Sequence, residues 1–290
     1  MQRNLFMSQI YAFLTVLLWS SAFVYTKIAL EYYAVSSLAL LRCVIASICL
    51  GTVLIFRKIP FPGLSSLPRF FLSGAVGFSL YILVFNKGSA LLNPTTSCVL
   101  IATAPIITAI LARLRFGEKL DIFRWAATGL AFCGILVMFL WRGAFVISMG
   151  IVWTLAAALL VSLYNILQRS LTGAFEPLVV TAYSFFAGTL LLLPFAAGAL
   201  EEVCGASASQ IWLAVFLGTC PSAIAYLLWA KALSLAPSTG NVSNAMFLTP
   251  FLALLLEYGV TGDVPGPETF VGGGIIMASL FLFLWTSRKP

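Results

Sequence analysis

Apolar stretches of about 20 residues recur along the whole chain, separated by short polar turns. A helix of that length spans the ~30 Å hydrocarbon core of a bilayer, where each backbone polar group needs a partner within the protein. Hydrophobic residues make up 61% of the 290 residues, against roughly 45–50% in soluble domains. Segments such as GIVWTLAAALLVSLYNIL are apolar on every face, which argues against the alternating strands of a membrane barrel. The sequence therefore predicts an all-α membrane protein.

Clusters of glycine, proline and charge divide the chain into ten candidate spans. An even number of spans places both termini on one side, and the loops on that side would hold 12 of the 16 basic residues. Because basic residues are retained in the cytoplasm, we expect cytoplasmic N and C termini. This topology also explains the net charge of +7, so we expect no nucleic-acid partner.

Several classes of chemistry are excluded by residue content. The chain has no histidine, which removes histidine proton relays, HExxH metal sites and Ser-His-Asp catalysis. Its six cysteines have no metal-ligand spacing, and VTGDV lacks the first glycine of a GxGD protease motif. We therefore expect no metal, no cofactor and no enzymatic activity, and an intramembrane enzyme or a channel is the disfavoured alternative.

The chain resembles itself at an offset of 145 residues. The matched pairs are Pro105 and Pro250, Gly117 and Gly262, and Gly129 and Gly274, with YILVFNKGSALLNP resembling YLLWAKALSLAP upstream of them. This similarity predicts two five-helix repeats, over residues 1–143 and 144–290. Because five is odd, the second repeat must enter the membrane from the opposite side.

Charge supports this inverted arrangement. The turn RLRFGEKLDIFR is basic, whereas its counterpart EYGVTGDVPGPE is acidic and contains no basic residue. Equivalent turns on opposite faces should differ in this way. Inverted repeats are typical of secondary transporters, in which the repeats move about a site near the middle of the membrane.

The segment ALLNPTTSCVLIATAPIITAILARLRFGEKLDIFRWAATGLAFCGILVMF resembles the drug/metabolite transporter (DMT) superfamily, in its ten-helix EamA-like branch. The residues that carry the resemblance are Pro105, the Gly117-Glu118 turn, Gly129, Trp19, Ser20, Lys27 and Arg42, with Pro250 and Gly274 in the second half. Asp263 replaces the usual Glu. The resemblance implies a carrier of amino acids or other small metabolites, with a central cavity lined by helices one, three, four, six, eight and nine.

Aromatic and amide side chains that share helix faces form the predicted substrate site, since residues three or four apart on a helix lie together. They are Trp19 and Phe23, Tyr81 and Phe85, Tyr164, Asn165 and Gln168, Tyr226 and Trp229, and Asn241 and Asn244. Such walls suit a small zwitterion whose ammonium rests against the rings. The same side chains could instead pack between helices.

Two prolines and two charged residues complete the candidates. Pro105 and Pro250 would free backbone carbonyls and act as hinges, or as inert kinks. Arg42 lies deep in the second span and is expected to pair within the bundle, reach the outer interface or bind a carboxylate. Glu257, near the outer end of the ninth span, is a candidate for proton coupling or charge pairing.

We therefore predict a secondary transporter that moves amino acids or related small metabolites by alternating access, in the direction of export. The alternative is an uptake carrier for nucleosides, sugars or choline-like amines. The expected location is the bacterial inner membrane, as a multi-pass protein. The expected partners are a small-molecule substrate and the lipid bilayer, and the protein is expected to be a monomer or a homodimer.

Overall fold

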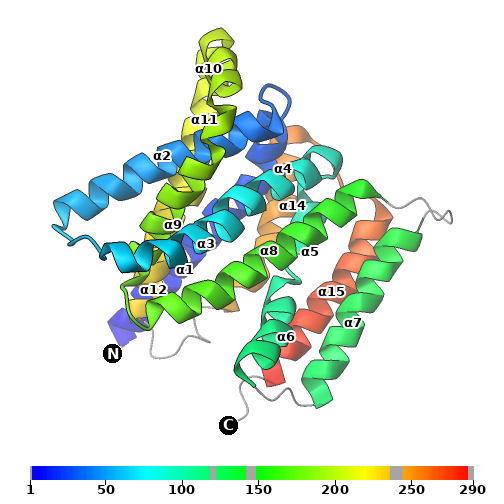
Figure 1. Ribbon diagram of the computed structural model, residues 1–290. Coiled ribbons are helices and arrows are strands. Elements are labelled where there is room, and N and C mark those ends of the chain that lie inside the picture. Colours follow the sequence, from blue (N-terminus) through cyan, green and yellow to red (C-terminus); the bar gives the residue numbers. More distant parts are fainter. Residues whose placement is uncertain (1, 118–121, 142–147, 236–243, 287–290) are drawn as a thin grey trace.

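The computed structural model describes residues 2–117, 122–141, 148–235 and 244–286, and within those ranges the regular elements are all helical (Figure 1). In chain order the elements are α1 Gln2–Ala29, α2 Val35–Phe56, η1 Leu64–Ser66, α3 Leu67–Gly74, η2 Ala75–Leu80, α4 Tyr81–Leu91, α5 Pro94–Ile101, α6 Ala104–Phe116, α7 Ile122–Leu140, α8 Met149–Thr172, α9 Pro177–Leu192, η3 Leu193–Phe195, α10 Ala196–Gly205, α11 Ala208–Thr219, η4 Cys220–Ile224, α12 Ala225–Leu235, η5 Asn244–Leu248, α14 Thr249–Thr261 and α15 Pro267–Thr286.

Within the described residues, seven helical stretches are long and apolar enough to cross a membrane. Three shorter apolar helices, Trp125–Met138, Thr249–Thr261 and Pro267–Leu282, lie where further spans were expected. The chain is therefore an all-helical, multi-span protein, as predicted. The count of ten spans stays a prediction.

Local sequence signals account for several helix boundaries. Pro94 and Pro177 are the first residues of α5 and α9, where the missing N–H has no intrahelical partner to lose. Ser207 and Gln210 form a capping box at the start of α11, in which the Gln210 side chain accepts a hydrogen bond from the Ser207 N–H at 2.8 Å. These signals separate helices that hydropathy alone would merge.

The two halves of the chain repeat the same series of elements. The helices α6 and α14 begin and end 145 residues apart, and each ends at a left-handed glycine, Gly117 with φ 70° and Gly262 with φ 74°. The segments η2 and η4 are both π-helical, and they too begin 145 residues apart, at Ala75 and Cys220. The two-repeat architecture thus extends to irregular details of the backbone.

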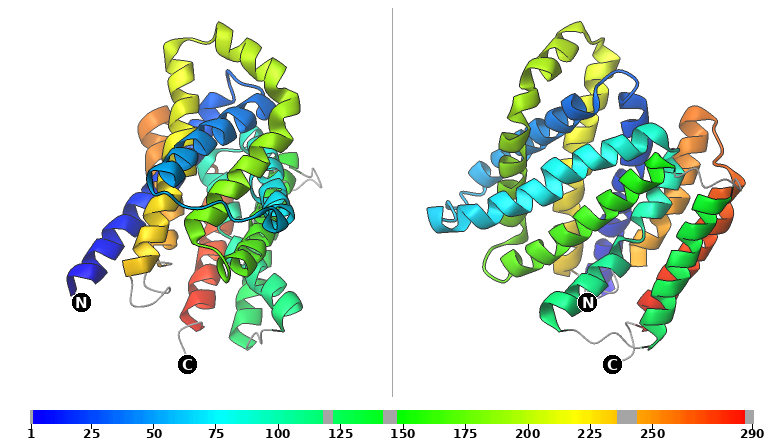
Figure 2. Two further views of the ribbon diagram at one scale, coloured as in Figure 1. Left: turned by 60° about the vertical axis from the view of Figure 1, so that its left-hand side comes forward. Right: turned by 45° about the vertical axis from the view of Figure 1, so that its right-hand side comes forward.

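The repeats run in opposite directions through the bundle. The turn after α6 and the turn after α14 lie at opposite ends, while α1 begins and α15 ends at the same end (Figures 1 and 2). The end at which α1 begins is termed the termini end. It also holds the turn after α8, whereas the hairpin between α10 and α11 lies at the opposite end (Figure 1).

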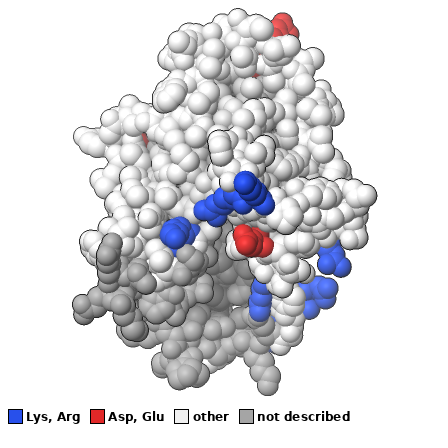
Figure 3. Space-filling model, turned by 90° about the vertical axis from the view of Figure 1, so that its left-hand side faces the viewer, with Lys and Arg blue, Asp and Glu red and all other residues white. Residues whose placement is uncertain are grey.

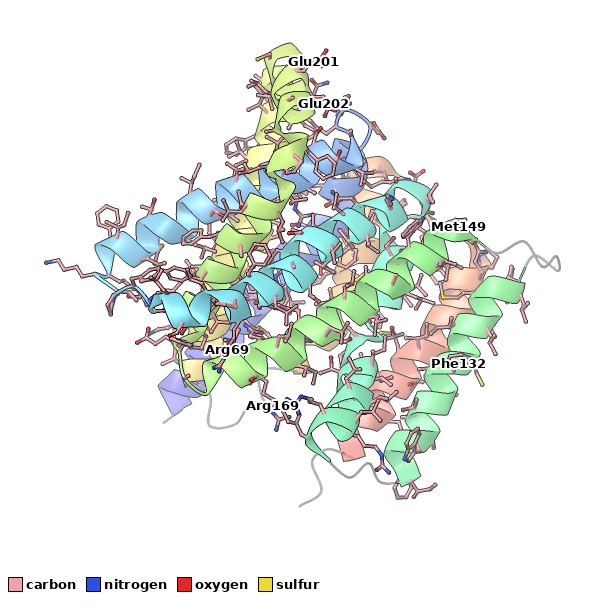
Figure 4. The ribbon with its side chains drawn as sticks, in the orientation of Figure 1. Arg69, Phe132, Met149, Arg169, Glu201 and Glu202 are labelled. Atoms are coloured by element: carbon pink, nitrogen blue, oxygen red, sulfur yellow. The ribbon has the colours of Figure 1, made fainter. Side chains whose placement is uncertain are left out.

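Close helix contacts hold the core together through small residues. The hydroxyls of Ser73 and Ser184 are 2.9 Å apart, and the rings of Phe78 and Phe185 are 3.7 Å apart between centroids. Gly74 lies between these contacts, so that α3 and α9 meet backbone to backbone. In contrast, Phe132 on α7 points away from the bundle and is 64% exposed, as a side chain facing lipid would be (Figure 4).

We expect Gly74→Ala to destabilise the fold. A Cβ at this position would meet the Ser184 carbonyl oxygen at 2.3 Å, and backbone cannot give way as a flexible side chain does. Overpacking of this kind costs about 1–3 kcal/mol. The measurement is the thermal unfolding midpoint in detergent, with Gly129→Ala as control, because a Cβ at Gly129 meets nothing within 4 Å. Equal midpoints for the two variants would contradict the proposed packing.

Candidate functional site

A cavity of about 700 Å³ lies between α2, α8, α9 and α12. Its lining consists of Leu50, Asn165, Gln168, Arg169, Thr172, Pro177, Leu178, Thr181, Tyr226, Leu227, Trp229 and Ala230. Four of the residues predicted from sequence therefore share one cavity. Of the described helices expected to line it, only α8 and α12 do so, whereas α2 and α9, which also line it, were not expected. The wall is mainly apolar, with two amides, one guanidinium and a few hydroxyls.

The cavity reaches the termini end of the bundle. Arg169 and Thr172 belong to the last turns of α8, and Pro177 opens α9; all three are exposed. Figure 3 shows basic side chains and one acidic side chain gathered near the middle and lower part of the described face, while its upper part carries little charge. In Figure 4, Arg69 and Arg169 lie toward the termini end, whereas Glu201 and Glu202 lie at the opposite end.

Aromatic rings from α1 and α12 meet beside the cavity. The Trp19 ring lies 5.7 Å from the Tyr226 ring and 5.3 Å from the Trp229 ring, between centroids. Tyr226 and Trp229 line the cavity, and Trp19 packs against both of them. The predicted convergence of these two helix faces is therefore present in the fold.

A second aromatic group lies between α1 and α4. The ring of Phe85 lies 5.4 Å from that of Phe23 and 5.7 Å from that of Tyr81, between centroids. Phe23 and Phe85 are buried against Cys98 and Ala253, so in this conformation they pack between helices. Tyr81 corresponds to Tyr226 at the 145-residue offset, which relates the two aromatic groups through the repeat.

The remaining residues that were predicted to line the substrate site lie in different surroundings. Tyr164 is buried against Phe78, 5.1 Å away between ring centroids, and fills the space over Gly77, where a Cβ would meet its ring at 2.2 Å. Asn165 donates to the Thr108 hydroxyl at 3.3 Å. Asn241 lies outside the described residues, and Asn244 is described only as the first residue of η5.

Both predicted hinge prolines stand at breaks between helical segments. The fourth span is interrupted after Ile101, and Pro105 is the second residue of the new helix α6. Pro250 likewise is the second residue of α14, directly after η5. Each proline thus begins a helix instead of bending one. Discontinuous spans are typical of transporter sites, and a hinge role for the two prolines stays a prediction.

Glu257 on α14 is 1% exposed and caps a helix of the other repeat. Its carboxylate accepts hydrogen bonds from the Thr95 N–H at 2.8 Å and from the Thr95 hydroxyl. Thr95 lies in the first turn of α5, where N–H groups have no intrahelical partner and the helix dipole favours negative charge. Thr95 was not among the residues predicted from sequence, although an Asn-Pro-Thr-Thr segment is typical of a helix N-terminus.

Other contacts also close the opposite end. The Thr96 and Thr269 hydroxyls are 2.7 Å apart, which joins α5 to α15. The Lys27 ammonium donates to the Ala90 carbonyl at 2.7 Å, and the Glu202 carboxylate accepts from the Ala34 N–H at 3.0 Å. Burial and the nearby Glu202 charge raise the pKa of the Tyr33 phenol in the same turn. This end is therefore tied across the bundle while the cavity reaches the other end.

Arg42 lies in α2 and is 6% exposed. It donates to the Thr26 hydroxyl at 3.2 Å and, more weakly, to the Ser222 hydroxyl at 3.5 Å. The predicted pairing within the bundle therefore involves neutral partners. Among the described residues, no three His, Cys, Asp or Glu side chains lie close enough together to hold a metal ion.

Comparison with known proteins gives consistent matches. A profile of the EamA-like transporter family matches twice, over residues 6–140 and 148–285. YdfC, an uncharacterized transporter of Bacillus subtilis, is 29% identical over 93% of this chain and 89% of its own length. A probable terminal-alkyne amino-acid exporter of Streptantibioticus cattleyicolor is 31% identical over 93% of this chain and 90% of its own length.

Two further matches differ in how much of each chain they cover. A riboflavin transporter of Rhizobium johnstonii is 29% identical over 66% of this chain and 63% of its own length. A solved crystal structure covers 97% of this chain and 99% of its own, with a TM-score of 0.64 and 18% identity, and so shares the fold. The names of these relatives describe transporters and not enzymes.

We expect Glu257→Ala to destabilise the protein by about 1–3 kcal/mol, because it leaves the buried Thr95 N–H without its acceptor. Glu257→Gln should cost less, since the amide oxygen can still accept one bond. The measurement is thermal unfolding in detergent, with the exposed Glu201→Ala as control. A Glu257→Ala midpoint equal to that of the control would show that the cap is dispensable.

Proposed function

The chain belongs to the EamA-like transporter family, and from this premise we propose that it exports amino acids or related small metabolites by alternating access. The observation that carries the proposal is the difference between the two ends of the bundle. A cavity between helices of both repeats reaches the termini end, while hydrogen bonds between repeats tie the opposite end. A carrier in one of its two end states has this form.

The size and chemistry of the cavity support a small organic solute. Its volume of about 700 Å³ lies within the roughly 300–1,000 Å³ of ordinary ligand sites. Tyr226 and Trp229 offer aromatic faces, and Asn165 and Gln168 offer amides that can fix an orientation. These groups match an amino acid better than a sugar, which would need more hydrogen-bonding partners.

We propose export because, in the orientation that we propose, the cavity opens to the side from which an exporter takes up its solute. Arg57, Lys58, Arg113, Arg115 and Arg169 occupy turns or helix ends assigned to the termini side, whereas Glu31, Glu201, Glu202, Asp263 and Glu268 belong to the other side. Under the positive-inside rule the termini end faces the cytoplasm, in a bacterial plasma membrane. The cavity would then load solute from the cytoplasm, as an exporter does.

The decisive experiment is solute counterflow in proteoliposomes that contain the purified protein. The panel comprises amino acids, nucleosides, sugars, choline and riboflavin, the last because a riboflavin transporter is among the relatives. The proposal predicts saturable counterflow of at least one amino acid. Flux without saturation or counterflow would indicate a channel, and counterflow of the other solutes alone would support the nutrient carrier.

We expect Ala230→Phe to reduce counterflow at least tenfold, because the added ring would occupy the cavity that Ala230 lines. The matched control is Ala126→Phe on α7, an exposed position away from the cavity lining. Both variants should remain monodisperse in detergent. Undiminished counterflow by Ala230→Phe would remove this cavity from the transport pathway.

The native residue Cys204 allows the orientation in the membrane to be tested without the introduction of a new cysteine. It is exposed on α10, next to the hairpin at the opposite end. A membrane-impermeant maleimide should therefore label Cys204 in intact cells, and Cys204→Ser should abolish that labelling. If Cys204 reacts only after the cells are lysed, the orientation is reversed and the loading side is wrong.

A further inference from the structure

Arg42 places a positive charge inside the membrane-spanning part of the bundle. It follows Val35, the first residue of α2, by seven positions, about 10 Å along the helix axis. Its side chain is 6% exposed. A buried charge at such depth is costly unless it is paired, and ionisable groups in membrane helices commonly serve ligand or ion pathways.

The partners of Arg42 leave its charge uncompensated. The two hydrogen bonds go to the neutral hydroxyls of Thr26 and Ser222, and the Nε atom is buried without a partner. No carboxylate in the described part of the chain pairs with the guanidinium. Guanidinium groups are suited to planar anions, which they bind through two parallel hydrogen bonds. The described residues therefore give the guanidinium two neutral acceptors but no negative charge to balance its own.

The surroundings of Arg42 also suit a ligand. Tyr81 and Tyr226 lie close enough to interact electrostatically with the guanidinium, and Tyr226 also lines the cavity. Each tyrosine stands just after a π-helical segment, η2 or η4, a backbone form that is frequent at functional sites. Ser222 lies within η4, and its hydroxyl proton is donated to the Leu217 carbonyl at 2.7 Å. Its oxygen is thus left to accept from Arg42.

The repeat provides an independent argument. The tyrosines and the π segments occur in both halves at the same offset, as expected for features of the shared fold. Arg42 does not follow this pattern, because α9, the second span of the second repeat, contains no basic residue. Arg42 therefore does not belong to the features that both repeats share, as a role specific to the first repeat would require.

We propose that Arg42 binds the carboxylate of the transported solute at the inner end of the cavity, with the phenols of Tyr81 and Tyr226 beside it. This inference rests on the proposed function and narrows it to solutes with a carboxylate. The apolar part of the solute would lie toward Trp229 and Leu227. Because Arg42 is buried in this conformation, the contact forms when the ligand reaches past Tyr226.

The test compares matched solutes that differ at one group. The probes are phenylalanine, leucine and threonine, each as the free acid, the amide and the decarboxylated amine. Thermal stabilisation and proteoliposome counterflow are measured for the wild-type chain. We expect the free acids to stabilise the protein and to undergo counterflow. The amides and amines should have about 10- to 100-fold lower affinity, which is the effect of losing a charge-assisted hydrogen bond. Equal action of acid and amide would overturn the inference.

Substitutions of Arg42 test whether this residue is responsible for the preference for the free acid. Arg42→Gln should lose the preference for the acid, and Arg42→Lys should keep part of it because the charge remains. Arg57→Gln, an exposed residue at the end of the same helix, is the control and should behave as wild type. If Arg42→Gln is monodisperse and keeps its acid preference within about twofold, Arg42 does not bind the carboxylate.

The outcomes also separate this inference from the proposed function. If the wild-type protein shows counterflow without preference for the acid, the transporter stands and the role of Arg42 fails. If no free amino acid or analogue undergoes counterflow, the proposed amino-acid function fails and the role of Arg42 fails with it. Since the wild-type comparison needs no variant, a folding defect in Arg42→Gln leaves the main arm of the test intact.

Discussion

The absence of water in the bilayer core is the constraint on which this structure depends. Backbone groups there must be paired within helices, so each break in a helix requires a local solution. The structure breaks the fourth span between α5 and α6 and places π segments between α3 and α4 and between α11 and α12. The hydroxyl of Ser222 pairs with a carbonyl five residues back, and Glu257 caps the start of α5. These breaks coincide with the positions at which the two repeats meet.

Inversion of one repeated series of helices explains why the two ends of the bundle can differ in their contacts while their backbones correspond. In the described conformation, the termini end has a cavity wall of Asn165, Gln168 and aromatic rings, and the opposite end has direct contacts from α5 to α14 and α15. These contacts join the two repeats. In the proposed alternating-access cycle, any motion that opens this end must break them, so Glu257 and Thr95 would take part in transport although they are distant from the cavity lining.

Much of this architecture could be predicted from the sequence because hydropathy, charge and the 145-residue similarity are properties of the chain itself. The matched turns at Gly117 and Gly262 followed from the 145-residue similarity, and helical spacing grouped Trp19 with Phe23 and Tyr226 with Trp229. Contacts between distant segments did not. Leu50 and Thr181 give no sign in the sequence of lining a cavity, and Tyr164 shares a helix face with Gln168 yet is buried against Phe78. A helical face can be read from spacing, but the neighbour that covers it depends on tertiary packing.

The most direct test of alternating access is to lock the opposite end. The Thr96 and Thr269 hydroxyls are 2.7 Å apart, so a Thr96→Cys, Thr269→Cys pair in a background without the native cysteines can form a disulfide between α5 and α15. Counterflow would be measured in proteoliposomes after oxidation and again after reduction. If this end must open during transport, oxidation stops counterflow and reduction restores it. Counterflow at an unchanged rate by the fully cross-linked protein would show that transport does not require this end to open.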